Sequence, residues 1–180
     1  MMRLMRRLAW LLILACSFAT THATMPDRIT PKSVAARIDD LGARGALEEI
    51  HQQEFSWHEL LRGIAGGSAE WLRVATQLRP AADADSSKQL GLAVGEALEH
   101  RPKNVLRVAF PGFELSTICG APDLDDERYD SYDRANKAID LRKEKVRGVS
   151  EPELAKLRDD CIKSLETSKA GVASFFGAHP

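Results

Sequence analysis

The chain has 180 residues, of which 25 are basic and 26 are acidic, so its formal net charge at pH 7 is −1. This length is enough for one domain with a sizeable hydrophobic core. A balance so near to neutral argues against a nucleic-acid partner, because binding to phosphates depends on clustered Lys and Arg.

Residues 1–23 have the features of a secretory signal peptide. Three arginines precede the apolar run Leu8–Ala15, which is too short to cross a bilayer as a stable helix. Small residues favour cleavage after Ala23, and a second suitable site ends at Ala19. We therefore expect a signal peptide over 1–23 and a single helical domain over 24–180. Cleavage after Ala23 removes three basic residues and no acid, which leaves a formal charge of −4.

Cys16 offers an alternative fate for the N-terminus. The sequence Ile13-Leu14-Ala15-Cys16 resembles a bacterial lipobox, in which the cysteine is acylated and becomes the first residue. Ordinary cleavage predicts a periplasmic or secreted protein, whereas acylation of Cys16 predicts a membrane-anchored lipoprotein. A membrane is expected as a partner only through this lipid anchor.

Both routes leave one pair of cysteines, Cys119 and Cys161. An even number of cysteines in an oxidising compartment predicts a disulfide bond. Two separate buried thiols are the alternative.

The first half of the domain shows helical spacing of apolar residues. Thr30 is a candidate N-cap before Pro31, and Gly42 interrupts the helix that follows. Two short segments that contain Trp57 and Trp71 then predict a helical hairpin whose rings face a shared core.

A further helix is predicted from about Asp85, a candidate N-cap, to Leu98. Gly91 and Gly95 lie one turn apart on it and predict a shallow groove that lets a neighbouring helix approach closely. A short helix is expected after Pro102. The segment that carries Cys119 could be helical or extended.

The longest helix is predicted from about Leu124 to Arg147, with acids in its first half and bases such as Arg142 near its end, which complements the helix dipole. The last helix should begin at a capping box formed by Ser150 and Glu153. Its apolar face includes Cys161, so a bond to Cys119 would hold this helix against the preceding loop.

The predicted fold is all-α, with antiparallel helical hairpins forming a compact bundle or a short HEAT-like stack held by one disulfide. The segment from Trp57 to Leu106 resembles uncharacterised exported bacterial proteins. The shared features are Trp71-Leu72, Leu78, Leu90, Ala97-Leu98, Pro102 and Val105-Leu106. This resemblance covers under a third of the chain and implies a fold rather than an activity.

The sequence contains no catalytic signature. A nucleophile elbow, a phosphate-binding loop and a dinucleotide-binding glycine motif are all absent. His51, Glu54 and His58 would share one face of an unbroken helix and could then bind a metal, but a helix break near Gln53 would separate them. We expect no catalytic residue, no metal and no cofactor.

The expected function is that of an exported, non-enzymatic protein that binds a protein partner, such as an inhibitor or an immunity-type protein. The alternative is a structural or accessory module of an envelope assembly. The predicted contact surface is acidic with two tyrosines, a residue type favoured at interfaces. It consists of Asp125, Asp126, Tyr129, Asp130, Tyr132 and Asp133.

Overall fold

The computed structural model describes residues 29–178, except Pro111 and the side chain of Glu54. This part of the chain contains eight helices and no strand, which confirms the predicted all-α class. The helices are α1 (Pro31–His51), α2 (Glu54–Ala65), α3 (Ala69–Leu78), α4 (Ala84–Glu96), α5 (Pro102–Asn104), α6 (Leu115–Ile118), α7 (Tyr132–Arg147) and α8 (Ala155–Phe175). The predicted signal peptide and Cys16 lie outside the described residues.

Local sequence signals explain how the first helix begins and bends. Thr30 caps α1, where its side chain accepts a hydrogen bond from the backbone N–H of Ser33 and the Ser33 hydroxyl lies 2.9 Å from the Thr30 backbone nitrogen. Gly42 has a φ of 72° and produces a kink within the helix. Only a residue without a β-carbon adopts this conformation readily.

Trp57 on α2 and Trp71 on α3 pack against the same hydrophobic core, as predicted. Trp57 is buried, and its indole nitrogen donates to Gln89 on α4 over 2.8 Å. The Trp71 ring lies against Gly63, where a β-carbon would come within 2.5 Å of the ring. Gly63 is therefore the position at which α2 makes room for α3.

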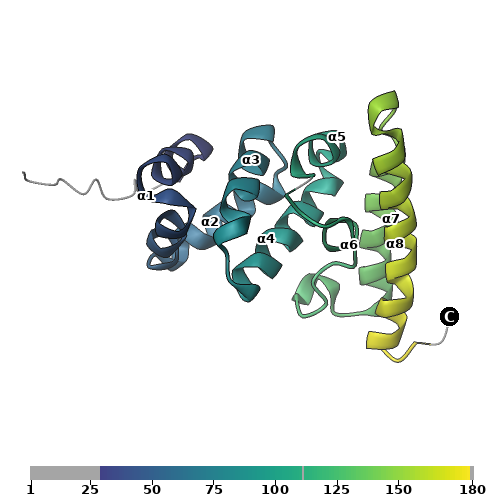
Figure 1. Ribbon diagram of the computed structural model, residues 1–180. Coiled ribbons are helices and arrows are strands. Elements are labelled where there is room, and N and C mark those ends of the chain that lie inside the picture. Colours follow the sequence, from purple (N-terminus) through teal and green to yellow (C-terminus); the bar gives the residue numbers. More distant parts are fainter. Residues whose placement is uncertain (1–28, 111, 179–180) are drawn as a thin grey trace, which may run out of the picture.

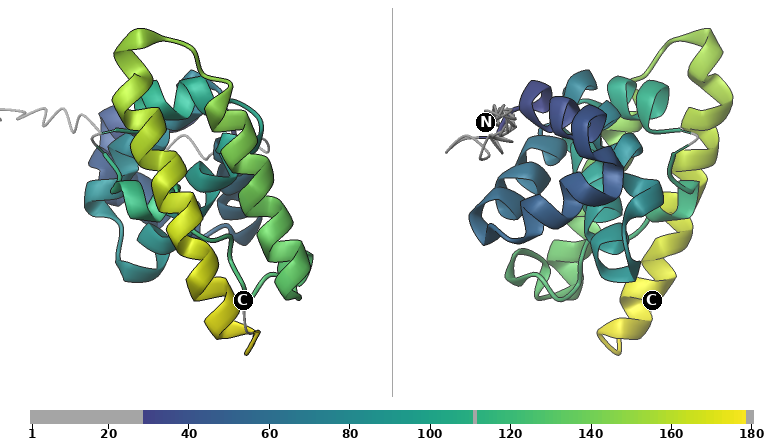
Figure 2. Two further views of the ribbon diagram at one scale, coloured as in Figure 1. Left: turned by 90° about the vertical axis from the view of Figure 1, so that its right-hand side faces the viewer. Right: turned by 60° about the vertical axis from the view of Figure 1, so that its left-hand side comes forward.

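Several helices pack on the second helix along the chain, whereas α7 packs mainly on α8. α1 contacts α3, α2 contacts α4, α4 contacts α6, and α6 contacts α8. Figure 1 shows the result, with α1 at one end of the molecule and the antiparallel pair α7 and α8 at the other. Figure 2 shows α7 and α8 side by side along their length. Among the described residues no helix has both the length and the apolar character needed to cross a membrane.

The glycines of α4 let α6 approach closely, as the sequence predicts. A β-carbon at Gly91 would lie 2.4 Å from the Thr117 methyl carbon, and one at Gly95 would lie 2.9 Å from the Ile118 carbonyl oxygen. Cys119 follows directly and is bonded to Cys161 on α8, which confirms the predicted disulfide. The bond joins two cysteines that are 42 residues apart in the sequence.

The expected helix from Leu124 to Arg147 was wrong in its first turns, because α7 begins at Tyr132 with Ser131 as its N-cap. Before it, the chain forms a loop with a 3-10 turn at Glu127–Tyr129. The reason is the Asp126 side chain, which accepts a hydrogen bond from the Arg128 backbone N–H over 2.8 Å. Short acidic side chains compete with helix formation in this way.

Two predicted caps were also wrong. α4 is capped by Asp83 rather than Asp85, through a 2.8 Å bond from the Ser86 backbone N–H. The predicted Ser150–Glu153 capping box does not form, since a 3-10 turn over Pro152–Leu154 with Glu151 as its N-cap precedes α8, and Glu153 pairs with Arg107 over 2.9 Å.

Candidate functional site

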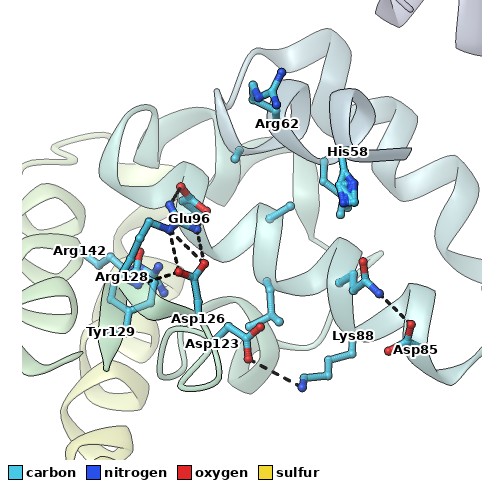
Figure 3. A pocket seen from close by; sticks show the side chains of 15 residues that line it. His58, Arg62, Asp85, Lys88, Glu96, Asp123, Asp126, Arg128, Tyr129 and Arg142 are labelled. Atoms are coloured by element: carbon cyan, nitrogen blue, oxygen red, sulfur yellow. Dashed lines mark hydrogen bonds and ion pairs between the residues drawn. The ribbon is translucent and has the colours of Figure 1, made fainter. Parts of the chain in front are cut away.

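The candidate site is a pocket of about 580 Å³ between α2, α4 and the loop that precedes α7. Figure 3 shows charged side chains around its edge. Its apolar lining comes from α2 and α4 and consists of Leu61, Ala65, Leu92 and Ala93. A volume of this size, with apolar walls and a few polar groups, is typical of a binding site.

The position of the loop follows from the close contact between α4 and α6. Because Gly95 allows the Ile118 carbonyl to lie against α4, the chain leaves α6 next to the open side of the pocket. The bond from Cys119 to Cys161 then fixes the start of this segment to α8. Loop residues Asp123, Asp126 and Tyr129 consequently line the pocket.

Arg128 fastens the loop to α4. Its guanidinium lies between two carboxylates, donating to Glu96 over 2.7 Å and to Asp126 over 2.8 Å. The hydrogen bonds from Arg128 hold the pKa of the Asp126 carboxyl below its ordinary value, and those to Glu96 raise the pKa of Arg128. The guanidinium also lies 5.3 Å from the centre of the Tyr129 ring. Figure 3 shows this cluster on one wall of the pocket.

Arg142 lies behind the cluster and is only 3% exposed. Its Nε donates to Glu99 over 2.9 Å. Tyr129 is half-buried beside this pair, and its loss of contact with water raises the pKa of its phenol above the ordinary value. The phenol is therefore protonated at neutral pH.

The opposite side of the pocket carries other polar groups. His58 and Arg62 are one turn apart on α2, and both line the pocket. Lys88 on α4 lies 3.8 Å from Asp123 and 3.9 Å from Asp125. Near the N-terminal end of α4, Asp85 accepts a 2.7 Å hydrogen bond from Gln89.

The structure divides the six residues of the predicted contact surface into three groups. Asp126 and Tyr129 are part of the pocket wall. Asp125 and Asp133 are exposed, and Asp130 pairs with Arg134 over 2.9 Å. Tyr132 packs against the core as the first residue of α7. The first part of the segment thus forms one edge of the pocket, and Tyr132 and Asp133 form the first turn of α7.

The possible metal ligands are divided between two helices. α1 ends at His51, and α2 begins after Gln53, so the helix break does separate the two histidines. The His51 ring packs edge-on against Trp57 with ring centres 4.3 Å apart, whereas His58 lines the pocket. Among the residues described, no group of three His, Cys, Asp or Glu side chains is placed to hold a metal ion.

Sequence reasoning missed the role of Arg142. It was assigned to the basic end of a helix, although it lies three residues after Ile139 and four before Val146. Both neighbours are completely buried, so this spacing places Arg142 on the same inward face. Glu96 and Glu99 gave no comparable signal, because their partners are more than 30 residues away.

The pocket therefore combines an apolar lining, a buried arginine and a rim of charged groups. Comparison of the chain with protein-family models, curated proteins and solved structures gives no match.

Proposed function

We propose that this is an exported, non-enzymatic binding protein, an inhibitor or immunity-type protein whose partner is a protein. The observation that carries the proposal is the pocket between α2 and α4, together with the exposed acids on its loop. We name this surface the pocket face and define it by the pocket lining and Asp125. A concave apolar region inside a polar rim is the usual arrangement of a protein-binding surface.

Charge on the loop supports a basic partner. Asp125 has a side chain that is 78% exposed, and its one ion pair among the described residues, to Lys88, is long at 3.9 Å. Glu127 and Asp133 are exposed and form no ion pair with any described residue. These carboxylates are available to attract positively charged side chains and to speed association.

The expected compartment also supports the proposal. A disulfide is compatible with an extracellular location, because thiols are kept reduced in the cytosol. Together with the signal peptide predicted over residues 1–23, it favours a periplasmic or secreted protein. Inhibitors that act on toxins or cell-wall hydrolases work in that compartment.

The test is affinity capture from an envelope extract with the mature protein, followed by binding measurements on the purified partner. We expect one toxin-like or hydrolase partner. Leu92→Glu in the pocket lining and Asp125→Lys on the rim should weaken binding by at least about tenfold. Asp39→Lys on α1 is the matched control, since Asp39 does not line the pocket. Equal affinities for all three variants would refute the pocket face as the binding surface.

A second candidate function is a structural or accessory module of an envelope assembly, soluble or lipid-anchored. The observation that favours it is the packing of α1 on α3, α2 on α4 and α4 on α6, each on the second helix along the chain. Such packing is the pattern of a short HEAT-like stack, and helical stacks provide extended surfaces for assembly. Capture of several envelope components, with no single partner of high affinity, would support this candidate.

A further inference from the structure

The guanidinium of Arg142 has hydrogen-bonding capacity that the described part of the chain does not use. An arginine has five N–H donors. Within residues 29–178, Glu99 accepts from Nε, and neither terminal nitrogen donates to a described acceptor. Neither terminal nitrogen is among the fully enclosed atoms that lack a partner, so both keep some access to space outside the protein. Arg142 is one of the residues that line the pocket.

The surrounding charges determine which acceptor suits these donors. Arg142 and Arg128 together carry two positive charges, and they face the carboxylates of Glu99, Glu96 and Asp126. The whole pocket lining has four basic side chains (Arg62, Lys88, Arg128, Arg142) and four acidic ones (Asp85, Glu96, Asp123, Asp126), and Glu99 adds one more negative charge, so an anionic ligand would increase a negative excess. A neutral carbonyl oxygen accepts the same hydrogen bonds without adding charge. The protonated Tyr129 phenol beside Arg142 is a further possible donor to such an oxygen.

The rest of the ligand must be apolar. Leu61 and Ala65 from α2 face Leu92 and Ala93 from α4 across the pocket. A leucine-sized side chain placed among them would lose its contact with water, which stabilises the complex. Every apolar residue of a peptide carries such a side chain next to a backbone carbonyl oxygen.

We propose that the pocket receives an apolar side chain from a peptide segment of the partner, whose backbone carbonyl accepts hydrogen bonds from Arg142. This inference rests on the proposed function, because it assumes a protein partner. Arg142 acts as a binding residue, and Glu99 is a positioning residue that orients the guanidinium through Nε. The acids on the loop attract the partner, and the pocket gives the contact its specificity.

The test uses the purified mature protein and three small probes, with binding followed by amide chemical shifts in NMR. N-acetyl-leucine methylamide is neutral and carries the proposed side chain and carbonyl. N-acetyl-leucine has a carboxylate in place of the second amide, and N-acetyl-glycine methylamide lacks the apolar side chain. We expect the first probe to shift resonances of residues that line the pocket and to bind at least about tenfold more tightly than the other two.

Two variants connect this binding to the pocket. Ala65→Leu fills part of the lining on α2 and should reduce affinity for the first probe by about tenfold or more. Ala170→Leu is the control, because Ala170 lies on α8 and does not line the pocket. Arg142→Lys keeps the charge opposite Glu99 but removes the planar donor pair, so it should weaken both neutral probes, because each presents the carbonyl oxygen that accepts from Arg142.

Tighter binding of the carboxylate probe, or no shifts at the pocket with any probe at millimolar concentration, would overturn the inference. Unchanged affinity in a folded Ala65→Leu variant would overturn it too. These outcomes involve no partner, so they leave the capture experiment intact. If the capture experiment yields no partner but the first probe still binds, the proposed function is refuted and the inferred binding chemistry of the pocket stands.

Discussion

Gly95 on α4 lies against the carbonyl oxygen of Ile118 at the end of α6, so closely that a β-carbon at residue 95 would come within 2.9 Å of that oxygen. This contact determines where the chain leaves α6 and therefore where the loop with Asp126 and Arg128 crosses to the pocket. The neighbouring disulfide bond and the hydrogen bonds from Arg128 to Glu96 and Asp126 hold the same loop at two further points. The shape of the pocket thus depends on a residue that contributes no side chain to it.

Replacing Gly95 by Ala should destabilise the protein by about 1–3 kcal/mol, because the new methyl group meets backbone that cannot simply rotate away. Gly171→Ala is the matched control. Gly171 lies within α8, and a β-carbon added there would have no other group within 4 Å, so alanine should stabilise the helix by about 0.5–1 kcal/mol. Urea unfolding of both variants measures these effects, and equal changes in stability would contradict this account of the α4–α6 contact.

Loss of the Cys119–Cys161 bond should cost about 3–4 kcal/mol, because the bond restricts a loop of 42 residues in the unfolded chain. The measurement is the free energy of unfolding of Cys119→Ala/Cys161→Ala, compared with the native protein under oxidising conditions. Reductant should lower the stability of the native protein and leave that of the double variant unchanged. A double variant as stable as the native protein would show that the bond contributes nothing.

Arg142→Met should cost about 3–5 kcal/mol, since it leaves Glu99 with an unpaired charge in a mostly buried position. Adding Glu99→Met should recover much of this loss, because a buried ion pair replaced by apolar groups of similar size is often nearly neutral. Arg142→Met, Glu99→Met and the double variant form a double-mutant cycle, in which stability is measured by unfolding in urea. A single Arg142→Met variant of native stability would rule out a buried, paired guanidinium.

The protein should lose stability as the pH falls below about 4. Hydrogen bonds from Arg128 lower the pKa of Asp126 below its ordinary value of 3.8, and those from Lys169 and Lys143 do the same for Asp140. A carboxyl group with a lowered pKa in the folded state stabilises the fold above its unfolded pKa, and this contribution is lost as the pH falls through the folded value. Asp126→Asn should therefore flatten the decrease of unfolding free energy between about pH 5 and pH 2. If Asp126→Asn has the same dependence of unfolding free energy on pH as the native protein, the Asp126–Arg128 interaction does not contribute to stability.

Signals within a few residues explain which parts of the fold could be predicted. Thr30 and Gly42 act through their own backbone or nearest turn, and Gly91 and Gly95 lie one turn apart on a single helix face, so these roles could be inferred even though the α6 partner of the two glycines could not. The start of α7 could not, because it depends on the bond from the Arg128 backbone to Asp126 and on Glu96, 32 residues away. A run of acids is compatible with either a helix start or a loop until such a partner is known.

The contact surface named from the sequence stays a prediction, and two of its residues lie at the pocket. The acidic segment was identified, and Asp126 and Tyr129 do reach the pocket. The parts of the pocket formed by α2 and α4 were not identified, because Leu61 and Leu92 cannot be distinguished in the sequence from other apolar helix residues. Arg142 shows what spacing can add, since its position between Ile139 and Val146 indicated burial even though its charge suggested the opposite.

The central claim is that the pocket face binds a protein partner, and site-specific photo-crosslinking in cells that export the protein tests it most directly. A photo-reactive phenylalanine analogue is placed in turn at the positions of Leu92 in the pocket lining, Asp125 on its rim and Ala170 on α8. We expect one and the same protein to be crosslinked from Leu92 and Asp125 and not from Ala170. Crosslinking of that protein from Ala170 alone, or equally from all three positions, would contradict the claim.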